Sequence, residues 1–307
     1  MATLGLPAMA GCAPPAGTTG GAASGRWHAL RGLLVPRDSF GLVALGGHLY
    51  AAGGMSGARG TALASVEAYD PAANAWTARA PLPLALSSMG AAPLAGQLMV
   101  AGGAHDDEAV PLAWRFEPPT GHWQAIAPMR SARFGHGLAT LDGYLYAAGG
   151  LAGGAPVAAL ERYDPARDAW AALAPLPVAR FNLALVALGG LLYAIGGSGA
   201  DRRPVATVDL YDPQRDRWSA GPALPEPLSN FAAAVAGDRT IHVLYHRTHL
   251  VFDRQRAEWT AARPMPTSRH GLGAAVLGST LYAAGGCAED PQRDLGTLEA
   301  LDVAVSR

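Results

Sequence analysis

The chain has 307 residues, of which 50% are hydrophobic and 15% are charged, so it can bury a large core and is not an intrinsically disordered chain. Its 23 basic residues, all of them arginine, face 24 acidic residues, and a formal net charge of −1 does not provide the basic surface that nucleic-acid binding requires. Glycine and proline make up about a fifth of the residues and no stretch reaches 18 apolar residues, which predicts a soluble, strand-rich protein without a membrane span.

Residues 1–25 contain no charged residue and are rich in Ala, Gly, Pro, Ser and Thr, so we expect a tail that precedes a single domain at 26–307. Within this tail, Met9-Ala10-Gly11-Cys12 resembles the cleavage site of a bacterial lipoprotein. A signal peptide needs a basic first segment, and none of the residues before Cys12 is basic. Two interpretations stay open: an extracytoplasmic lipoprotein whose true start is not Met1, and a cytoplasmic protein with a plain tail.

A repeat of about 47 residues runs through the rest of the chain. The first five units each have a tryptophan seven residues after an aromatic residue, and a turn with proline follows it. Such markers in fixed register predict a repeat architecture. In the fifth unit Tyr245-His246 stands where the other units have a glycine pair. The pairs lie at 53–54, 102–103, 149–150, 196–197 and 285–286, and the tryptophans are Trp76, Trp123, Trp170, Trp218 and Trp259.

Each unit predicts four strands. In the third unit, the small apolar segment 133–141 suits an innermost strand, and 144–148, 160–163 and 170–173 predict the other three. Tyr163-Asp164-Pro165 predicts the turn between the last two strands. Glycine at the end of the second strand permits positive φ and close backbone approach, while the Tyr and Trp rings fill the space between neighbouring sheets.

The two ends of the repeat complement each other. The sixth unit stops at Arg307 without its tryptophan strand, and Trp27 to Leu30 form such a strand with no unit before it. We therefore predict that the N-terminal strand completes the last sheet, which closes a ring of six sheets and hides two sheet edges.

These markers resemble the kelch repeat, whose signature is a double glycine followed by spaced Tyr and Trp residues. The resemblance covers about residues 26 to 307 and implies an all-β, six-bladed β-propeller of four-stranded blades. It also implies a monomeric binding module with its ligand, a protein segment or a glycan, at the mouth of the central channel where the inner strands start.

An arginine opens the inner strand in four of the six units, sixteen residues before the glycine pair. Some kelch proteins use arginines at this position, near the channel mouth, to hold acidic ligands. In the same four units an acid lies two residues before the aromatic position of the third strand, and the units without the arginine also lack the acid. This co-occurrence favours structural pairing, within or between blades, over ligand binding. The arginines are Arg37, Arg133, Arg180 and Arg269, and the acids are Glu67, Glu161, Asp209 and Glu299.

The polar residues beside these arginines differ from unit to unit, and the lining of a ligand pocket would show such variation. Neutral drift at a solvent-filled channel mouth would give the same variation. His136 and His270, in units three and six, would lie opposite one another and could serve as acid and base. Such an acid–base pair would suit an alternative function, that of a sugar epimerase or mutarotase similar to the bacterial kelch enzymes that act on sialic acid. No catalytic motif in the sequence matches those enzymes. The third interpretation is a scaffold protein without a small-molecule site. The candidate lining residues are Ser39, Ser88, His136, Asn182, Asn230 and His270.

The loops after the glycine pairs are individual to each unit. His105-Asp106-Asp107-Glu108 is acidic and Arg202-Arg203 is basic. In the fifth unit, alternation along a strand places His242 and His246 on one face and His249 on the other. None of these groups has the spacing of a metal site, and Cys12 and Cys287 are the only cysteines, so we expect no metal, cofactor or disulfide.

Overall fold

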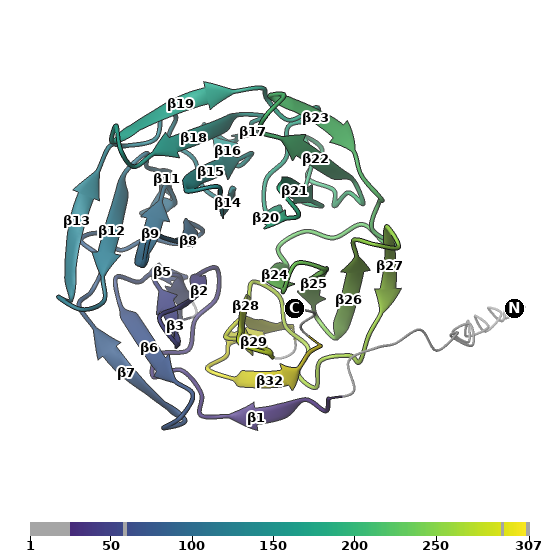
Figure 1. Cartoon of the computed structure of the whole chain (residues 1–307). Coiled ribbons are helices and arrows are strands. Elements are labelled where there is room, and N and C mark those ends of the chain that lie inside the picture. Colours follow the sequence, from purple (N-terminus) through teal and green to yellow (C-terminus); the bar gives the residue numbers. More distant parts are fainter. Residues whose placement is uncertain (1–24, 58–59, 290–291, 305–307) are drawn as a thin grey trace, which may run out of the picture.

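The computed structural model describes residues 25–57, 60–289 and 292–304. The predicted tail and its Cys12 therefore lie outside the described residues, except for Gly25. The described chain forms six four-stranded antiparallel sheets that stand as blades around a central channel (Figure 1). The prediction of an all-β, six-bladed propeller is confirmed. None of the described residues belongs to a helix long and apolar enough to cross a membrane.

In blades 1 to 3 the strands follow the chain outwards from the channel. Blade 1 consists of β2 (Gly41–Leu45), β3 (His48–Ala52), β6 (Val66–Asp70) and β7 (Ala75–Arg79); blade 2 of β8 (Gly90–Leu94), β9 (Gln97–Ala101), β12 (Ala113–Glu117) and β13 (His122–Ile126); blade 3 of β14 (Gly137–Leu141), β15 (Tyr144–Ala148), β18 (Leu160–Asp164) and β19 (Ala169–Leu173).

Blades 4 and 5 repeat this order, and blade 6 takes its outer strand from the N-terminus. Blade 4 consists of β20 (Ala184–Leu188), β21 (Leu191–Ile195), β22 (Val208–Asp212) and β23 (Arg217–Ala220); blade 5 of β24 (Ala232–Ala236), β25 (Thr240–Tyr245), β26 (Thr248–Asp253) and β27 (Glu258–Ala261); blade 6 of β28 (Gly273–Leu277), β29 (Thr280–Ala284), β32 (Leu298–Asp302) and β1 (His28–Leu30).

The ring is closed non-covalently, as predicted. Strand β1 lies antiparallel to β32, with His28 opposite Ala300 and Leu30 opposite Leu298 (Figure 1, purple against yellow). Trp27, just before β1, is buried and donates its Nε1–H to the carbonyl of Arg263 at 3.1 Å. The first and last parts of the chain thus share one sheet and one core.

The repeated tryptophans hold neighbouring blades together. In blade 3 the Nε1–H of Trp170 donates to the carbonyl of Ala127 in blade 2 at 2.8 Å, and the Trp170 ring packs on Tyr163 with centroids 5.4 Å apart. The other tryptophans of the repeat make the equivalent bond to the preceding outer strand or its connection. These bonds join Trp76 to Arg31, Trp123 to Ala80, Trp218 to Ala174 and Trp259 to Pro222, at 2.8–2.9 Å.

Short ribbons follow the glycine pairs and rim one end of the channel. Each ribbon begins beside the segment that leads into the inner strand of its own blade, as the bridge between Phe134 and Leu151 shows in blade 3. The ribbons are β4 (Met55–Ser56) with β5 (Thr61–Ala62), β10 (Ala104–His105) with β11 (Glu108–Ala109), β16 (Leu151–Ala152) with β17 (Ala155–Pro156), and β30 (Cys287–Glu289) with β31 (Gln292–Asp294).

Candidate functional site at the channel mouth

The channel mouth is narrowed by a closed circle of backbone hydrogen bonds. One residue from each blade, two positions after the strand-opening arginine or its equivalent, has a positive φ of 50–62°. Each donates its N–H to the carbonyl of its counterpart in the preceding blade, at 2.6–3.1 Å. We call this circle the mouth ring. Its members are Ser39, Ser88, Gly135, Asn182, Asn230 and Gly271.

Four of the predicted lining residues, the two serines and the two asparagines, lie in the mouth ring, but the two histidines do not. The ring positions of blades 3 and 6 belong to Gly135 and Gly271, so His136 lies one residue after the ring and His270 one residue before it. His136 nevertheless lies among the residues that line the mouth cavity, and His270 does not. The ring is defined by backbone conformation, which glycine satisfies without a side chain, so polar residue types do not mark its positions.

The mouth ring and the residues that follow it line a cavity of about 130 Å³. Sites that enclose small-molecule ligands usually measure about 300–1,000 Å³. The cavity therefore has room for a single side chain or a few waters, and not for a buried sugar. Further along the inner strands, the channel widens to a cavity of about 290 Å³ with a mostly apolar lining.

His136 packs between blades 2 and 3 and fills a position that is apolar in the other blades. A Cβ added at Gly90 or Gly102 would lie 2.8 or 2.7 Å from its ring, so two glycines of blade 2 make room for the imidazole. Burial, together with the positive charge of Arg133, lowers the pKa of His136 to about 3. The imidazole is therefore neutral at physiological pH and is not protonated to serve as a general acid. The corresponding residues are Phe40, Met89, Leu183, Phe231 and Leu272.

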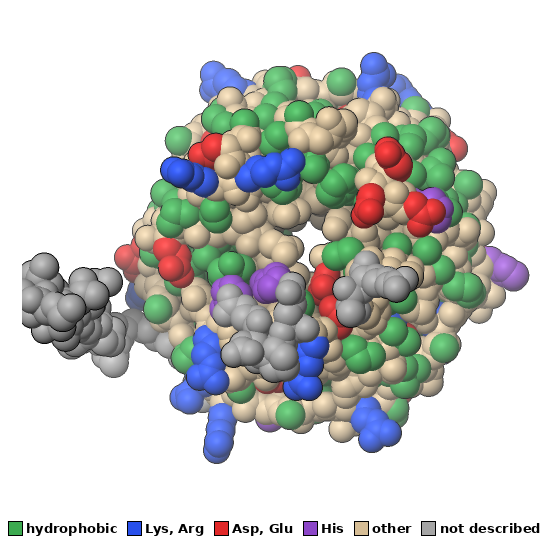
Figure 2. Space-filling model, turned by 180° about the vertical axis from the view of Figure 1, so that it is seen from behind, with side chains coloured by type: hydrophobic (Ala, Val, Ile, Leu, Met, Phe, Trp, Pro, Cys, Tyr) green, Lys and Arg blue, Asp and Glu red, His purple; other side chains and the backbone are tan. Residues whose placement is uncertain are grey.

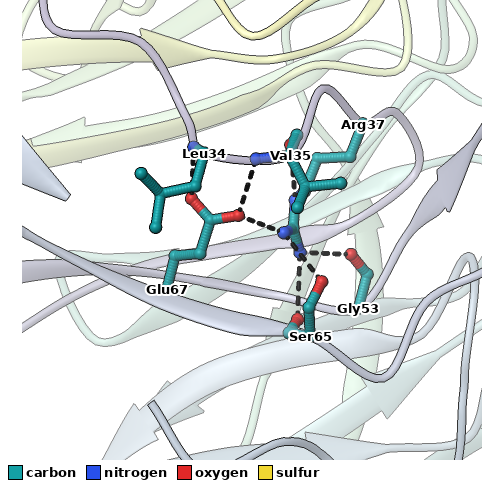
Figure 3. A network of polar contacts seen from close by, with 6 residues as sticks. All are labelled: Leu34, Val35, Arg37, Gly53, Ser65 and Glu67. Atoms are coloured by element: carbon teal, nitrogen blue, oxygen red, sulfur yellow. Dashed lines mark hydrogen bonds and ion pairs between the residues drawn. The ribbon is translucent and has the colours of Figure 1, made fainter. Parts of the chain in front are cut away.

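Each of the four arginines forms an ion pair with the acid of its own blade, and each has 0% of its surface exposed. In blade 1, Arg37 pairs with Glu67 and donates to the carbonyls of Gly53 and Ser65 at 2.9 and 3.0 Å (Figure 3). Glu67 in turn accepts the backbone N–H groups of Leu34 and Val35. The network fastens the segment before β2 to β6 and to the end of β3.

The other three pairs repeat this arrangement. Burial lowers the pKa of the arginines, and the neighbouring acids oppose that shift. Because the guanidinium groups are enclosed and bonded to backbone carbonyls, the structure exposes none of them at the mouth, and the co-occurrence in the sequence corresponds to packing within a blade. The nitrogen–oxygen distances are 3.2 Å for Arg133 and Glu161, 2.5 Å for Arg180 and Asp209, and 3.0 Å for Arg269 and Glu299.

Blade 5 leaves a gap in the rim. Strands β25 and β26 are joined directly through residues 246–247, where the other blades have a ribbon or a longer loop. His246 takes the place of the second glycine of the pair: its φ is 49° and its N–H donates to the carbonyl of Arg269, as that of Gly150 does to Arg180. The rings of His246 and His270 lie 5.6 Å apart, with Tyr245 beside His246. His270 thus belongs to this gap.

The other two histidines of blade 5 form a buried pair. Because β25 and β26 are antiparallel neighbours, Nδ1 of His242 comes within 2.9 Å of Nε2 of His249, which corrects the expectation that these residues occupy opposite faces. The remaining ring nitrogens contact Thr240 and the carbonyl of Arg263. Burial lowers the pKa of His242 to about 3 and that of His249 to about 4. All four ring nitrogens lie within hydrogen-bonding distance of protein atoms, so the pair offers no free metal ligands.

Charged loops surround the mouth unevenly. Asp106 and Asp107 are exposed on the ribbon of blade 2, and Arg202 and Arg203 are exposed on the loop of blade 4. Figure 2 shows a central hollow with acidic side chains on one side, basic side chains on another and histidines at its edge. The rim therefore offers different charges in different directions.

Comparison with known families gives a match to the Kelch motif at residues 36–83, 132–177 and 179–225, which cover blades 1, 3 and 4. Kelch-like protein 35 from Mus musculus is 58% identical over 66 residues, 22% of this chain and 11% of the relative. The human Kelch-like protein 35 is 55% identical over 58 residues, 19% of this chain and 10% of the relative. Kelch-like protein 26 from Mus musculus is 44% identical over 78 residues, 25% of this chain and 12% of the relative. The matches thus span about a tenth of the length of these relatives.

Proposed function

Because the chain belongs to the kelch-repeat β-propeller family, we propose that it is a protein-interaction module that holds an extended segment of a partner protein across the channel mouth. The observation that carries this proposal is the shape of the mouth. A shallow cavity of about 130 Å³ lies inside a rim of loops that differ from blade to blade. Variable loops on a rigid scaffold are suited to recognising a surface or a peptide.

The gap in blade 5 gives such a segment a path to the mouth. The shortened β25–β26 hairpin lowers the rim beside His246 and His270, while the rims of blades 2 and 4 carry opposite charges. A segment that leaves through the gap can place one side chain in the mouth cavity. Its own charges then meet Arg202 and Arg203 or the acids of blade 2.

Selection of binders from a random peptide library on the full chain tests the proposal. Peptides should lose at least about tenfold in affinity on the R202E/R203E variant and on H246G, in which blade 5 regains the glycine of the other blades. The matched control is R215E, since Arg215 lies on the same blade in the turn at the opposite face. Peptides that bind all variants equally would contradict the proposal. Glycans that bind on an array and are lost in the mouth variants would replace the peptide as ligand.

A further inference from the structure

A larger cavity lies beside the mouth, between blades 1 and 6. It measures about 690 Å³. Asp38, at the start of blade 1, and the ribbon residues Met55 to Gly57 form one side, and Cys287 and Asp294 from the β30–β31 ribbon of blade 6 form the other. This cavity is separate from the cavity within the mouth ring.

Three side chains of types that can ligate a metal ion converge on the cavity wall. One carboxylate oxygen of Asp38, one of Asp294 and Sγ of Cys287 all lie within 4.8 Å of one another. The backbone fixes this arrangement: Cys287 faces Asp294 across the ribbon, and Asp38 forms a bridge with Met55. Asp294 also accepts the N–H of Gly57 at 2.6 Å, which joins the ribbons of the two blades.

The charges of this cluster favour a cation. Among the described residues, no ion pair neutralises Asp38 or Asp294, and Arg293 lines the cavity without bonding to either carboxylate. The Cys287 side chain is 6% exposed. A divalent ion would remove the repulsion between the carboxylates and favour the thiolate.

We propose that Asp38, Cys287 and Asp294 bind a zinc ion, with a fourth position open to water or to a ligand in the cavity. Zinc binds cysteine sulfur at about 2.3 Å and carboxylate oxygen at about 2.1 Å, and zinc sites with three protein ligands keep a fourth position open. The side chains need to close by only about 1 Å to reach that geometry, because ligand atoms around a tetrahedral zinc ion lie about 3.5 Å apart.

The site would reinforce the non-covalent closure of the ring. Its ligands come from blade 1 and blade 6, and blade 6 is completed by β1 through hydrogen bonds and packing rather than by chain continuity. Zinc bound here would link the first and last blades. About 250 residues separate Asp38 from Cys287 in the sequence, which explains why no metal motif is visible there.

Metal titration of the full chain, without a polyhistidine tag, tests the site. The C12S variant provides the background, because it leaves Cys287 as the single thiol. Cobalt(II) should give a thiolate-to-metal charge-transfer band that saturates at one equivalent and that zinc removes. Saturating zinc should raise Tm by about 5 °C. The band should disappear in C12S/C287S, and D38N and D294N should each weaken binding at least about tenfold.

The matched control is D106N/D107N, which removes two exposed acids from the ribbon of blade 2 and should leave the titration unchanged. Circular dichroism verifies that each variant keeps its β-sheet spectrum. The proposal is wrong if no band forms, if the band persists in C12S/C287S, or if both aspartate variants bind cobalt as tightly as the background.

Discussion

Blades 1, 3, 4 and 6 have a buried arginine–acid pair where blades 2 and 5 have two apolar side chains. In blade 2, Leu86 takes the arginine position and Trp114 the acid position, with 0% and 7% of their surfaces exposed. The backbone is the same in both cases: the carbonyl of Leu86 accepts the N–H of Gly54 as that of Arg133 accepts the N–H of Gly103. Blade 5 has Leu228 and Leu250. One backbone thus accommodates either an ion pair or an apolar pair.

The residue at the arginine position and the residue at the acid position must therefore change together. A buried charge without its partner costs far more than the pair contributes, whereas well-packed apolar residues of similar volume can replace a whole pair at little cost. Each of the six blades has either the arginine–acid pair or the apolar pair, and none combines one member of each.

Removing the arginine of one buried ion pair should give the largest loss of stability. R133A leaves Glu161 buried and without its cation, so the free energy of unfolding should fall by about 3–5 kcal/mol in chemical denaturation. The control is R115A in blade 2, because Arg115 bonds to Gln124 and the change should cost less than about 0.5 kcal/mol. A loss below about 1 kcal/mol for R133A would show that the pair is not important for packing.

The sequence predicts those features of the fold that depend on one side chain repeated in each blade. Each tryptophan makes the same bond to the preceding blade, and each arginine has its acid in the same blade, so both appear as periodic or co-occurring residues. The closure by β1 follows because a partial unit at each end must find a partner.

The sequence does not reveal features built by the backbone or by distant residues. The mouth ring uses Ser, Gly and Asn at one conformation, so no residue type marks it. The pairing of His242 with His249 depends on how the shortened hairpin sets the register of two strands. Asp38 and Asp294 meet only because the ring closes between blades 6 and 1.

The neutral histidine beside the Arg133–Glu161 pair should make stability depend on pH. Its pKa of about 3 in the folded protein lies below the unfolded value of about 6.5, so the unfolded state binds more protons between these values and stability falls as pH decreases below 6.5. At pH 5 this one group should cost about 2 kcal/mol relative to pH 7.5. H136M copies Met89 of blade 2 and should remove that part of the loss, as denaturation at both pH values would measure. An unchanged pH dependence would mean that His136 binds protons equally in the folded and unfolded states, so that folding does not lower its pKa.

Replacing the ion pair of blade 3 by two leucines, as in blade 5, should lower the free energy of unfolding by a smaller amount. The double variant R133L/E161L removes both charges at once, so we expect a loss of about 1 kcal/mol, well below that of R133A alone. The residual cost arises because the N–H of Arg130, which donates to Glu161 at 2.7 Å, must bond to water instead. A double-mutant cycle with R133L and E161L measures the coupling, and strictly additive losses would contradict the pairing.

The outer edge of the blades should tolerate a change of charge that the core does not. Asp168 in blade 3 accepts the Tyr163 hydroxyl and the N–H of Ala127 at 2.8 and 2.9 Å, and Asn74 in blade 1 accepts the equivalent groups with a neutral amide oxygen. Both residues have φ near 47°, a conformation that asparagine adopts readily. D168N should therefore change the free energy of unfolding by less than about 0.5 kcal/mol, whereas D168A, which loses both bonds, should cost at least about 1 kcal/mol.

Unfolding at acid pH gives a further test of the hydrogen bonds that Asp168 accepts. The bonds from Ala127 and Tyr163 hold the pKa of Asp168 below its usual value, so its contribution is present above the unfolded pKa of about 3.9 and is lost as pH falls through the lower folded value. D168N should remove that loss from the unfolding curve below about pH 4 while leaving stability at pH 7 unchanged. If D168N instead destabilised the protein at pH 7 as strongly as D168A, the charge itself, and not the accepted hydrogen bonds, would hold the outer edge of blade 3 to blade 2.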